Sequence, residues 1–141
     1  MSFTEVANVL DEARARSILL LCHHNADPDA VCSAYAFQSL LSRFRPNMTA
    51  EIGTGQGISK LSKHLLKHIP ITVNLHPDVE KADAIVLLDT KTIQQLGNLA
   101  DKIAKTMAPI IVIDHHAAHP LADCRSLLEA QRRDRPLRLA L

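Results

Sequence analysis

The stretch that decides the fold is Pro109 to His116, which reads P-I-I-V-I-D-H-H. Its four aliphatic residues, Ile110 to Ile113, form a run that is too short for a helix and apolar on both faces. Such a run is typical of a central strand in a parallel sheet that helices cover on both sides. Asp114, His115 and His116 follow at the strand end, where open α/β sheets bind their ligands. The stretch therefore predicts a buried strand that leads into a functional site.

Two earlier stretches repeat this arrangement. Ile18 to Cys22 leads into the segment H-H-N-A-D-P-D, residues 23 to 29, and Ala84 to Leu88 leads into Asp89. Segments with helical spacing separate the apolar runs, and this alternation predicts an α/β fold with a parallel sheet and right-handed crossovers. We expect helices over about 4–16, 28–44, 59–68 and 92–107, and strands over about 17–22, 48–52, 71–75, 84–88 and 110–113.

Composition limits the size and the partners of the protein. With 141 residues and 47% hydrophobic content, the chain suits one domain. A net charge of +1 is not the footprint of a duplex-DNA binder, and 3% aromatic content leaves few rings on which bases could stack. Any contact with nucleic acid must therefore be local.

The cysteines and the apolar runs indicate a cytoplasmic protein. Cys22, Cys32 and Cys124 do not have a zinc-type spacing, and reduced, packed thiols are the expected state. The N-terminal segment lacks a signal-peptide pattern, and no apolar run approaches the ~18 residues that a membrane span requires.

The polar residues at the strand ends predict a metal site. Asp27 and Asp29 lie one residue apart at the start of a helix, where two carboxylates repel each other unless a cation lies between them. Together with His23, Asp89 and His115 they offer the oxygen and nitrogen ligands that Mn²⁺ or Mg²⁺ favours. Two such ions can share one bridging carboxylate, activate a water and neutralise a phosphoryl group. Taken singly, Asp29 or Asp89 could instead be a helix N-cap, and this alternative stays open.

These residues carry a family resemblance. His23-x-Asn25-x-Asp27-x-Asp29 followed by Ser33, then a strand ending in Asp89, then Asp114-His115-His116, resembles the first three motifs of the DHH phosphoesterase superfamily. That group includes RecJ-like single-strand exonucleases, oligoribonucleases, cyclic-dinucleotide phosphodiesterases, manganese pyrophosphatases and exopolyphosphatases. The resemblance implies a three-layer, mostly parallel, Rossmann-like sheet flanked by helices.

The resemblance also implies a role for each polar residue. His23 and Asp27 would hold one Mn²⁺ or Mg²⁺ ion, Asp29 and His115 the other, and Asp89 would bridge the two. His116 would be catalytic, meeting the substrate phosphate or helping to protonate the leaving group, and Asp114 would orient the neighbouring imidazoles.

The C-terminal part of the chain departs from the family pattern. Members of the superfamily carry a fourth motif, an Asp well beyond the DHH triplet, and a separate C-terminal substrate domain, whereas 25 residues follow His116 here. We therefore expect a DHH-type domain over 1–123, an atypical basic tail over 124–141, no C-terminal substrate domain and an incomplete second metal site. Asp123 and Asp134 are weak candidates for the missing ligand. A natural short form, a fragment and a frameshift product remain open.

For two weaker motifs a structural interpretation is favoured over a functional one. Residues 53–57, G-T-G-Q-G, could cradle a phosphate but lack a P-loop ending, so a flexible strand-to-helix turn is the expected reading. His64 and His68 could share a metal, but the lysines beside them favour a solvated helix face.

We expect a metal-dependent phosphoesterase domain that hydrolyses phosphodiester bonds of short single-stranded nucleic acid or nucleotides. Two alternatives stay open. One is a pyrophosphatase or exopolyphosphatase, and the other is an inactive DHH-like binding module or fragment. Neither the exact substrate nor the oligomeric state can be read from the sequence.

Overall fold

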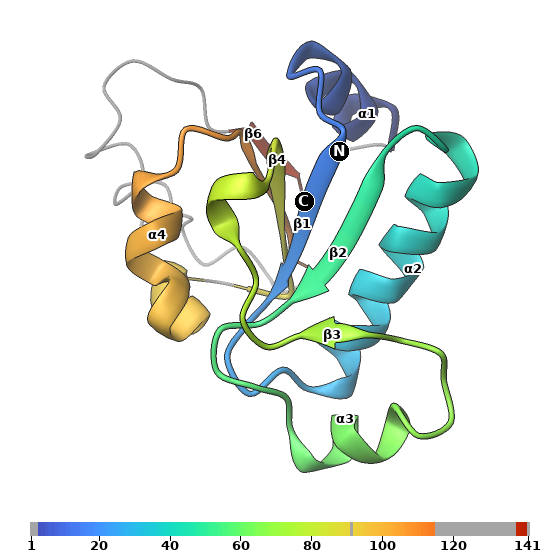
Figure 1. The fold of residues 1–141 in the computed structure, drawn as a ribbon, viewed down its shortest axis with the longest axis vertical. Helices are drawn as coiled ribbons and strands as arrows, with labels where there is room; N and C mark the ends of the chain where they lie inside the picture. Colours follow the sequence, from blue (N-terminus) through green and yellow to red (C-terminus); the bar gives the residue numbers. More distant parts are fainter. Residues whose placement is uncertain (1–2, 91, 115–137, 141) are drawn as a thin grey trace.

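The computed structural model describes residues 3–90 and 92–114 and the backbone of 138–140. It contains a six-stranded, entirely parallel sheet in the order β3-β2-β1-β4-β5-β6 (Figure 1). The elements are α1 (Phe3–Glu12), β1 (Ser17–Cys22), α2 (Pro28–Phe44), β2 (Thr49–Gly53), α3 (Lys60–Leu65), β3 (Val73–Asn74), the 3₁₀ helix η1 (Val79–Lys81), β4 (Ala84–Leu88), the 3₁₀ helix η2 (Ile93–Leu99), α4 (Ala100–Lys105), β5 (Ile110–Ile113) and β6 (Arg138–Ala140).

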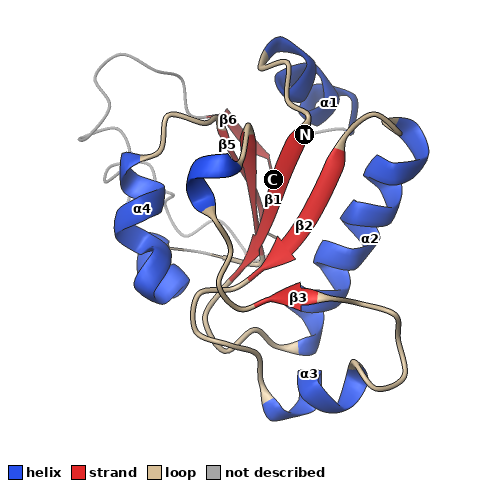
Figure 2. Cartoon of the chain, viewed as in Figure 1, coloured by secondary structure: helices blue, strands red, loops and turns tan. Residues whose placement is uncertain are grey.

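Helices cover both faces of the sheet, as Figure 2 shows. In β1, Ile18 and Leu20 pack in one hydrophobic core with residues of α1 and α2, while Leu19 and Leu21 pack in a second core with residues of η2 and α4. Successive strand residues point to opposite faces, so an uninterrupted apolar strand fills both cores. The α/β prediction of a three-layer parallel sheet is confirmed.

Four predicted elements have the expected bounds, namely β1, α2, β4 and β5. For α2 the reason is local. Asp27 is its N-cap, with Oδ1 accepting a hydrogen bond from the Ala30 N–H at 3.0 Å, and Pro28 stands at the first helical position. These boundary signals are encoded in adjacent residues, and the sequence could therefore reveal them.

The continuous helix expected over 92–107 was wrong. The segment forms η2 and then α4, and Gly97 interrupts the helical backbone within η2, because its φ of 59° and ψ of −127° are incompatible with a right-handed helix. Ile93, Leu96, Leu99 and Ile103 are buried as expected. Met107 lies beyond the helix and is 64% exposed.

Other boundaries differ by a few residues. The first helix ends at Glu12 instead of near Arg16, since the Asp83 carboxylate accepts hydrogen bonds from the backbone N–H groups of Arg16 and Ser17 and holds them in the extended entry to β1. The helix over 59–68 and the strand over 71–75 are shorter than expected.

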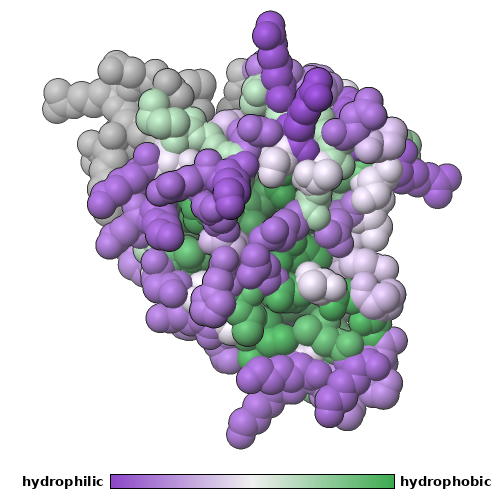
Figure 3. Space-filling view, in the orientation of Figure 1, coloured by the Kyte–Doolittle hydropathy of each residue, from purple (hydrophilic) through white to green (hydrophobic). Residues whose placement is uncertain are grey.

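The surface of the view in Figure 3 is mixed. Hydrophobic residues gather in its centre and lower half, and hydrophilic side chains surround them. In the part of the chain that the structure describes, no helix is both long enough and apolar enough to cross a membrane.

Candidate metal centre

Strand order and register bring the predicted polar residues together. From β1 the sheet grows through β2 and β3 on one side and through β4, β5 and β6 on the other, so a topological switch point lies between β1 and β4. Cys22 of β1 pairs with Leu88 of β4, and Leu88 pairs with Ile113 of β5. His23, Asp89 and Asp114, the residues that directly follow these three, therefore leave the sheet side by side.

Three of these side chains form a group that could hold a metal ion. His23 Nε2 lies 3.9 Å from Asp27 Oδ1 and 4.0 Å from Asp89 Oδ2, and one ligand atom from each residue lies within 4.8 Å of the others. Two ligands on opposite sides of a Mg²⁺-sized ion are separated by about 4 Å. The three donors therefore surround a volume of the right size, and one imidazole with two carboxylates is a donor set that Mn²⁺ and Mg²⁺ accept.

The hydrogen bonding of His23 prepares its ring for a metal. Nδ1 lies 2.8 Å from the carbonyl oxygen of His24, and because a carbonyl can only accept, Nδ1 carries the proton. In the neutral ring Nε2 then keeps its lone pair, and Nε2 is the atom that faces Asp27 and Asp89. A backbone carbonyl that orients a ligating imidazole in this way is usual at metal sites.

The two carboxylates differ in their surroundings. The side chain of Asp27 is 50% exposed, and it caps α2 while facing His23. That of Asp89 is 8% exposed, and its backbone has φ 50°. Aspartate tolerates this left-handed conformation better than most residues, and such strained positions gather at functional sites. Asp89 is therefore the more deeply placed donor of the group.

The loop after β2 supports the segment that carries His23. Thr54 is fully buried, and its hydroxyl lies 3.0 Å from the carbonyl oxygen of His23 and 3.2 Å from that of Gly57. Ala26 donates its backbone N–H to Gly57 and accepts from the N–H of Ser59. The loop thus forms the turn that the sequence predicted, and it is hydrogen-bonded to the backbone of the segment that carries His23 and Asp27.

The negative charges of the group affect the buried thiol of Cys22, the residue directly before His23. Burial raises the pKa of the Cys22 thiol to about 12, and the nearby charges of Asp89 and Asp27 add to the effect. The thiol donates to the Ala30 carbonyl oxygen at 3.4 Å. A neutral, buried thiol is not a metal ligand, which agrees with the prediction of a reduced packing cysteine at Cys22. The same prediction was wrong about packing at Cys32, which is a free but exposed thiol on α2.

The remaining predicted site residues have different positions. Asp29 is exposed in the first turn of α2 and does not belong to the three-residue group, and Asp114 is partly buried directly after β5. The N-cap of α2 is Asp27 and that of η2 is Thr92, so neither Asp29 nor Asp89 caps its helix. Outside the described residues lie His115, His116, Asp123, Cys124 and Asp134.

Sequence reasoning missed Thr54 and Gln95. The Gln95 carbonyl oxygen accepts from the backbone N–H of His24 and lies 2.8 Å from His24 Nδ1, so η2 fixes the turn after β1. The only sequence signal for Thr54 was a small polar residue in a glycine-rich loop after β2. Nothing in the sequence marked Gln95, because it contacts His24 through its backbone carbonyl, a group that every residue has.

The rings of His64 and His68 lie 5.3 Å apart in an edge-to-face arrangement, and both side chains are exposed. His64 lies in the last turn of α3 and His68 follows that helix, and neither belongs to the three-residue group.

Comparison with known proteins identifies the family. The model of the DHH family N-terminal domain matches residues 17–135. An uncharacterized protein of Methanocaldococcus jannaschii, MJ0988, is 36% identical over 115 residues, which cover 82% of this chain and 34% of that protein. The chain thus spans about a third of the length of this curated relative.

A crystal structure supports the fold assignment. An exopolyphosphatase-related protein from Bacteroides fragilis superposes with a TM-score of 0.67 at 18% identity, over 91% of this chain and 42% of that one. At this identity the likeness concerns the fold. With the family match and the three-residue group at the switch point, the chain belongs to the DHH family through its N-terminal domain, within a superfamily of phosphoesterases and phosphohydrolases.

Proposed function

We propose that this chain is a metal-dependent phosphoesterase domain that hydrolyses phosphodiester bonds in short single-stranded nucleic acid or nucleotides. The observation that carries the proposal is the convergence of His23 Nε2 with carboxylate oxygens of Asp27 and Asp89 at the switch point of the sheet. This convergence joins two segments that are distant in sequence, and a divalent cation would relieve the repulsion between the two carboxylates.

In this proposal each site residue has a defined part. His23 and Asp27 hold one Mn²⁺ or Mg²⁺ ion, Asp29 and His115 hold a second, and Asp89 bridges them. When bound, the ions supply an activated water and neutralise the developing charge on the phosphoryl group. Asp114 orients the imidazoles that follow it, and His116 contacts the substrate phosphate or protonates the leaving oxygen. We further propose a DHH-type domain over residues 1–123 and a basic tail after it.

Hydrolysis of a labelled single-stranded oligonucleotide by the full chain tests the proposal. We expect mononucleotide release with Mn²⁺ and none with a chelator. Asp89→Asn keeps the side-chain shape and tolerates the same φ. It should nevertheless reduce the rate by more than about a hundredfold, because mutation of a group that only orients a metal ligand already costs up to about a hundredfold in activity. The charge-matched control is Asp101→Asn on the exposed side of α4. Undiminished Mn²⁺-dependent activity in Asp89→Asn would refute the assigned site.

The alternative substrates are tested in the same preparation. Phosphate release from pyrophosphate and from polyphosphate is measured beside the oligonucleotide assay. The comparison distinguishes a phosphodiesterase from a pyrophosphatase or exopolyphosphatase. If the chain binds Mn²⁺ and hydrolyses none of the three substrates, the binding-module alternative holds instead.

A further inference from the structure

A groove of about 780 Å³ lies near the amino ends of β1 and β2, whereas the metal centre lies at the carboxyl ends of the strands. The end of α1, the segment before β1 and the turn between α2 and β2 form its walls. These elements lie at the top of Figure 1, whereas the arrowheads of β1 and β2 point toward the bottom. At about 3.3 Å per residue, the six residues of β1 separate the groove from His23 by roughly 20 Å. The groove is therefore no part of the proposed hydrolytic site.

The groove is basic. Arg14, Arg16 and Arg45 line it, and Asp11 is the one acidic residue in its lining, so the lining has a formal charge of +2 in a chain whose net charge is +1. Arg45 Nη2 is paired with Asp11 Oδ2 at 2.9 Å, while Arg14 and Arg16 are exposed. Two acidic residues flank the arginines, Glu12 on α1 and Asp83 beside the backbone of Arg16.

The backbone that carries these arginines is held in place. Asp83 Oδ2 accepts from the Arg16 N–H at 2.9 Å, and the Arg16 carbonyl accepts from the Thr49 N–H at 2.7 Å. Arg14 has φ 51°, a left-handed conformation that glycine adopts without strain and arginine does not. Folding alone favours a glycine at this helix end, so Arg14 is expected to be less favourable for stability there than glycine.

An aromatic ring stands beside the arginines. Phe44, the last residue of α2, is 52% exposed and lines the groove together with Pro46 and Met48. Its ring also meets the ring of Phe3 at a centroid distance of 5.7 Å, which supports it from one side. Arginines along a groove with an aromatic ring are the combination that single-stranded nucleic acids bind, through their phosphates and through base stacking.

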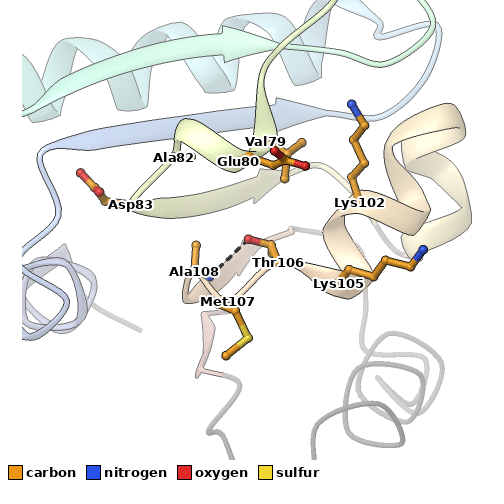
Figure 4. Close-up of a pocket in the computed structure, with 9 residues that line it drawn as sticks. All are labelled: Val79, Glu80, Ala82, Asp83, Lys102, Lys105, Thr106, Met107 and Ala108. Atoms are coloured by element: carbon orange, nitrogen blue, oxygen red, sulfur yellow. Dashed lines mark hydrogen bonds between the residues drawn. The ribbon is translucent and has the colours of Figure 1, made fainter.

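A second hollow, of about 470 Å³, lacks this combination. It lies before β4 and β5, where Lys102 and Lys105 of α4 share the lining with Glu80 and Asp83 (Figure 4). Its formal charges cancel, and Met107 is its only long exposed apolar side chain. It does not select a charged ligand.

We propose that the arginine groove binds the phosphate backbone of a single-stranded oligonucleotide, with one base against Phe44. This binding requires no metal and does not depend on the hydrolytic site. It agrees with the low net charge and the low aromatic content, which restrict any nucleic acid contact to a local patch.

The test is fluorescence anisotropy of a labelled thymidine oligonucleotide with the full chain, in chelator and at low salt. Arg14→Gly removes a charge and relieves the positive φ, so the variant should be at least as stable as the parent chain and yet bind at least about threefold more weakly. Arg16→Ala should weaken binding similarly, and each lost phosphate contact should lower the slope of log affinity against log salt by about 0.7. Phe44→Leu, which keeps an apolar side chain, should weaken binding about fivefold or more.

The matched control is the double variant Lys60→Ala/Lys63→Ala, which removes two exposed cations from α3 and should leave binding within about twofold. Equal losses in this control and in the arginine variants would overturn the proposal, because they would indicate general charge attraction only. Unchanged binding in Arg14→Gly and Arg16→Ala would overturn it as well, and so would unchanged binding in Phe44→Leu. Because chelator is present throughout, none of these results depends on whether the metal centre is active.

Discussion

At the scale of single residues, Asp83 shows how one side chain determines where an element begins. Its Oδ2 atom accepts from the N–H of Ser17 at 2.8 Å and from that of Arg16 at 2.9 Å. These two hydrogen bonds, with the Ser17 bond the larger cause, hold the pKa of the carboxyl group below its usual range, and the charge of Arg16 adds to them. Hydrogen bonds to the charged form favour that form, so ionised Asp83 stabilises the fold.

This gives a pH-dependent prediction. A carboxyl group whose pKa is lowered on folding stabilises the native state above its unfolded pKa of about 4, and the stabilisation is lost as the pH falls through the lower folded value. Asp83→Asn should therefore be less stable than the parent chain at neutral pH, and the difference should shrink as the pH falls from about 5 to below 3. Urea unfolding across this range measures it. A difference that stays constant with pH would contradict the role of the charge, and Asp101→Asn is the control.

At the scale of elements, the break at Gly97 inside η2 depends on a contact with a distant loop. Gly97 has φ 59°, and a Cβ placed there would lie 2.6 Å from Oε1 of Gln56. The helical spacing correctly predicted that Ile93 and Ile103 are buried, because that pattern reports which face meets the sheet. It could not report the break, because the loop that packs against Gly97 follows β2, far earlier in the chain.

Gly97→Ala should lower the free energy of unfolding by about 1 to 3 kcal/mol, the cost of a non-glycine residue in this conformation. Gly57→Ala is the matched control, since Gly57 has φ 88° but nothing within 4 Å of a Cβ there. The excess cost at Gly97 should disappear in a Gln56→Ala background if the contact causes it. Denaturant unfolding of Gly97→Ala, Gly57→Ala, Gln56→Ala and the double variant Gln56→Ala/Gly97→Ala measures the cost of the backbone conformation and the cost of the contact with Gln56. A Gly97→Ala chain as stable as its parent would contradict the argument.

At the scale of the whole molecule, the metal centre should link ligand binding to folding. Its donors come from the segment between β1 and α2 and from the residue after β4, which lie together only in the folded sheet. The same centre brings two carboxylates close to a buried thiol, and their charges contribute to the raised pKa of Cys22. A cation that binds only the folded chain stabilises it by mass action.

We therefore expect Mn²⁺ to raise the midpoint of thermal unfolding relative to chelator, with a gain of about 2.7 kcal/mol at a hundred times the dissociation constant. Asp89→Asn removes one of two neighbouring negative charges, so without metal it should be at least as stable as the parent chain. It should also lose most of the Mn²⁺-induced shift, while Asp101→Asn should keep it. An equal shift in Asp89→Asn would mean that Mn²⁺ binds elsewhere.

The sequence by itself determined which segments become buried strands and which polar residues end them. The apolar runs of β1, β4 and β5 and the cap of α2 are local signals, and each was placed within its observed bounds. Only the tertiary structure decided that Cys22 pairs with Leu88 and that Asp27 joins His23 and Asp89 while Asp29 remains exposed. It also decided that Thr54 supports the His23 segment and that arginines from the segments after α1 and α2 share a groove with Phe44. The physical reason is that strand register and loop packing arise from contacts between distant segments, and such contacts leave no periodic pattern in the chain.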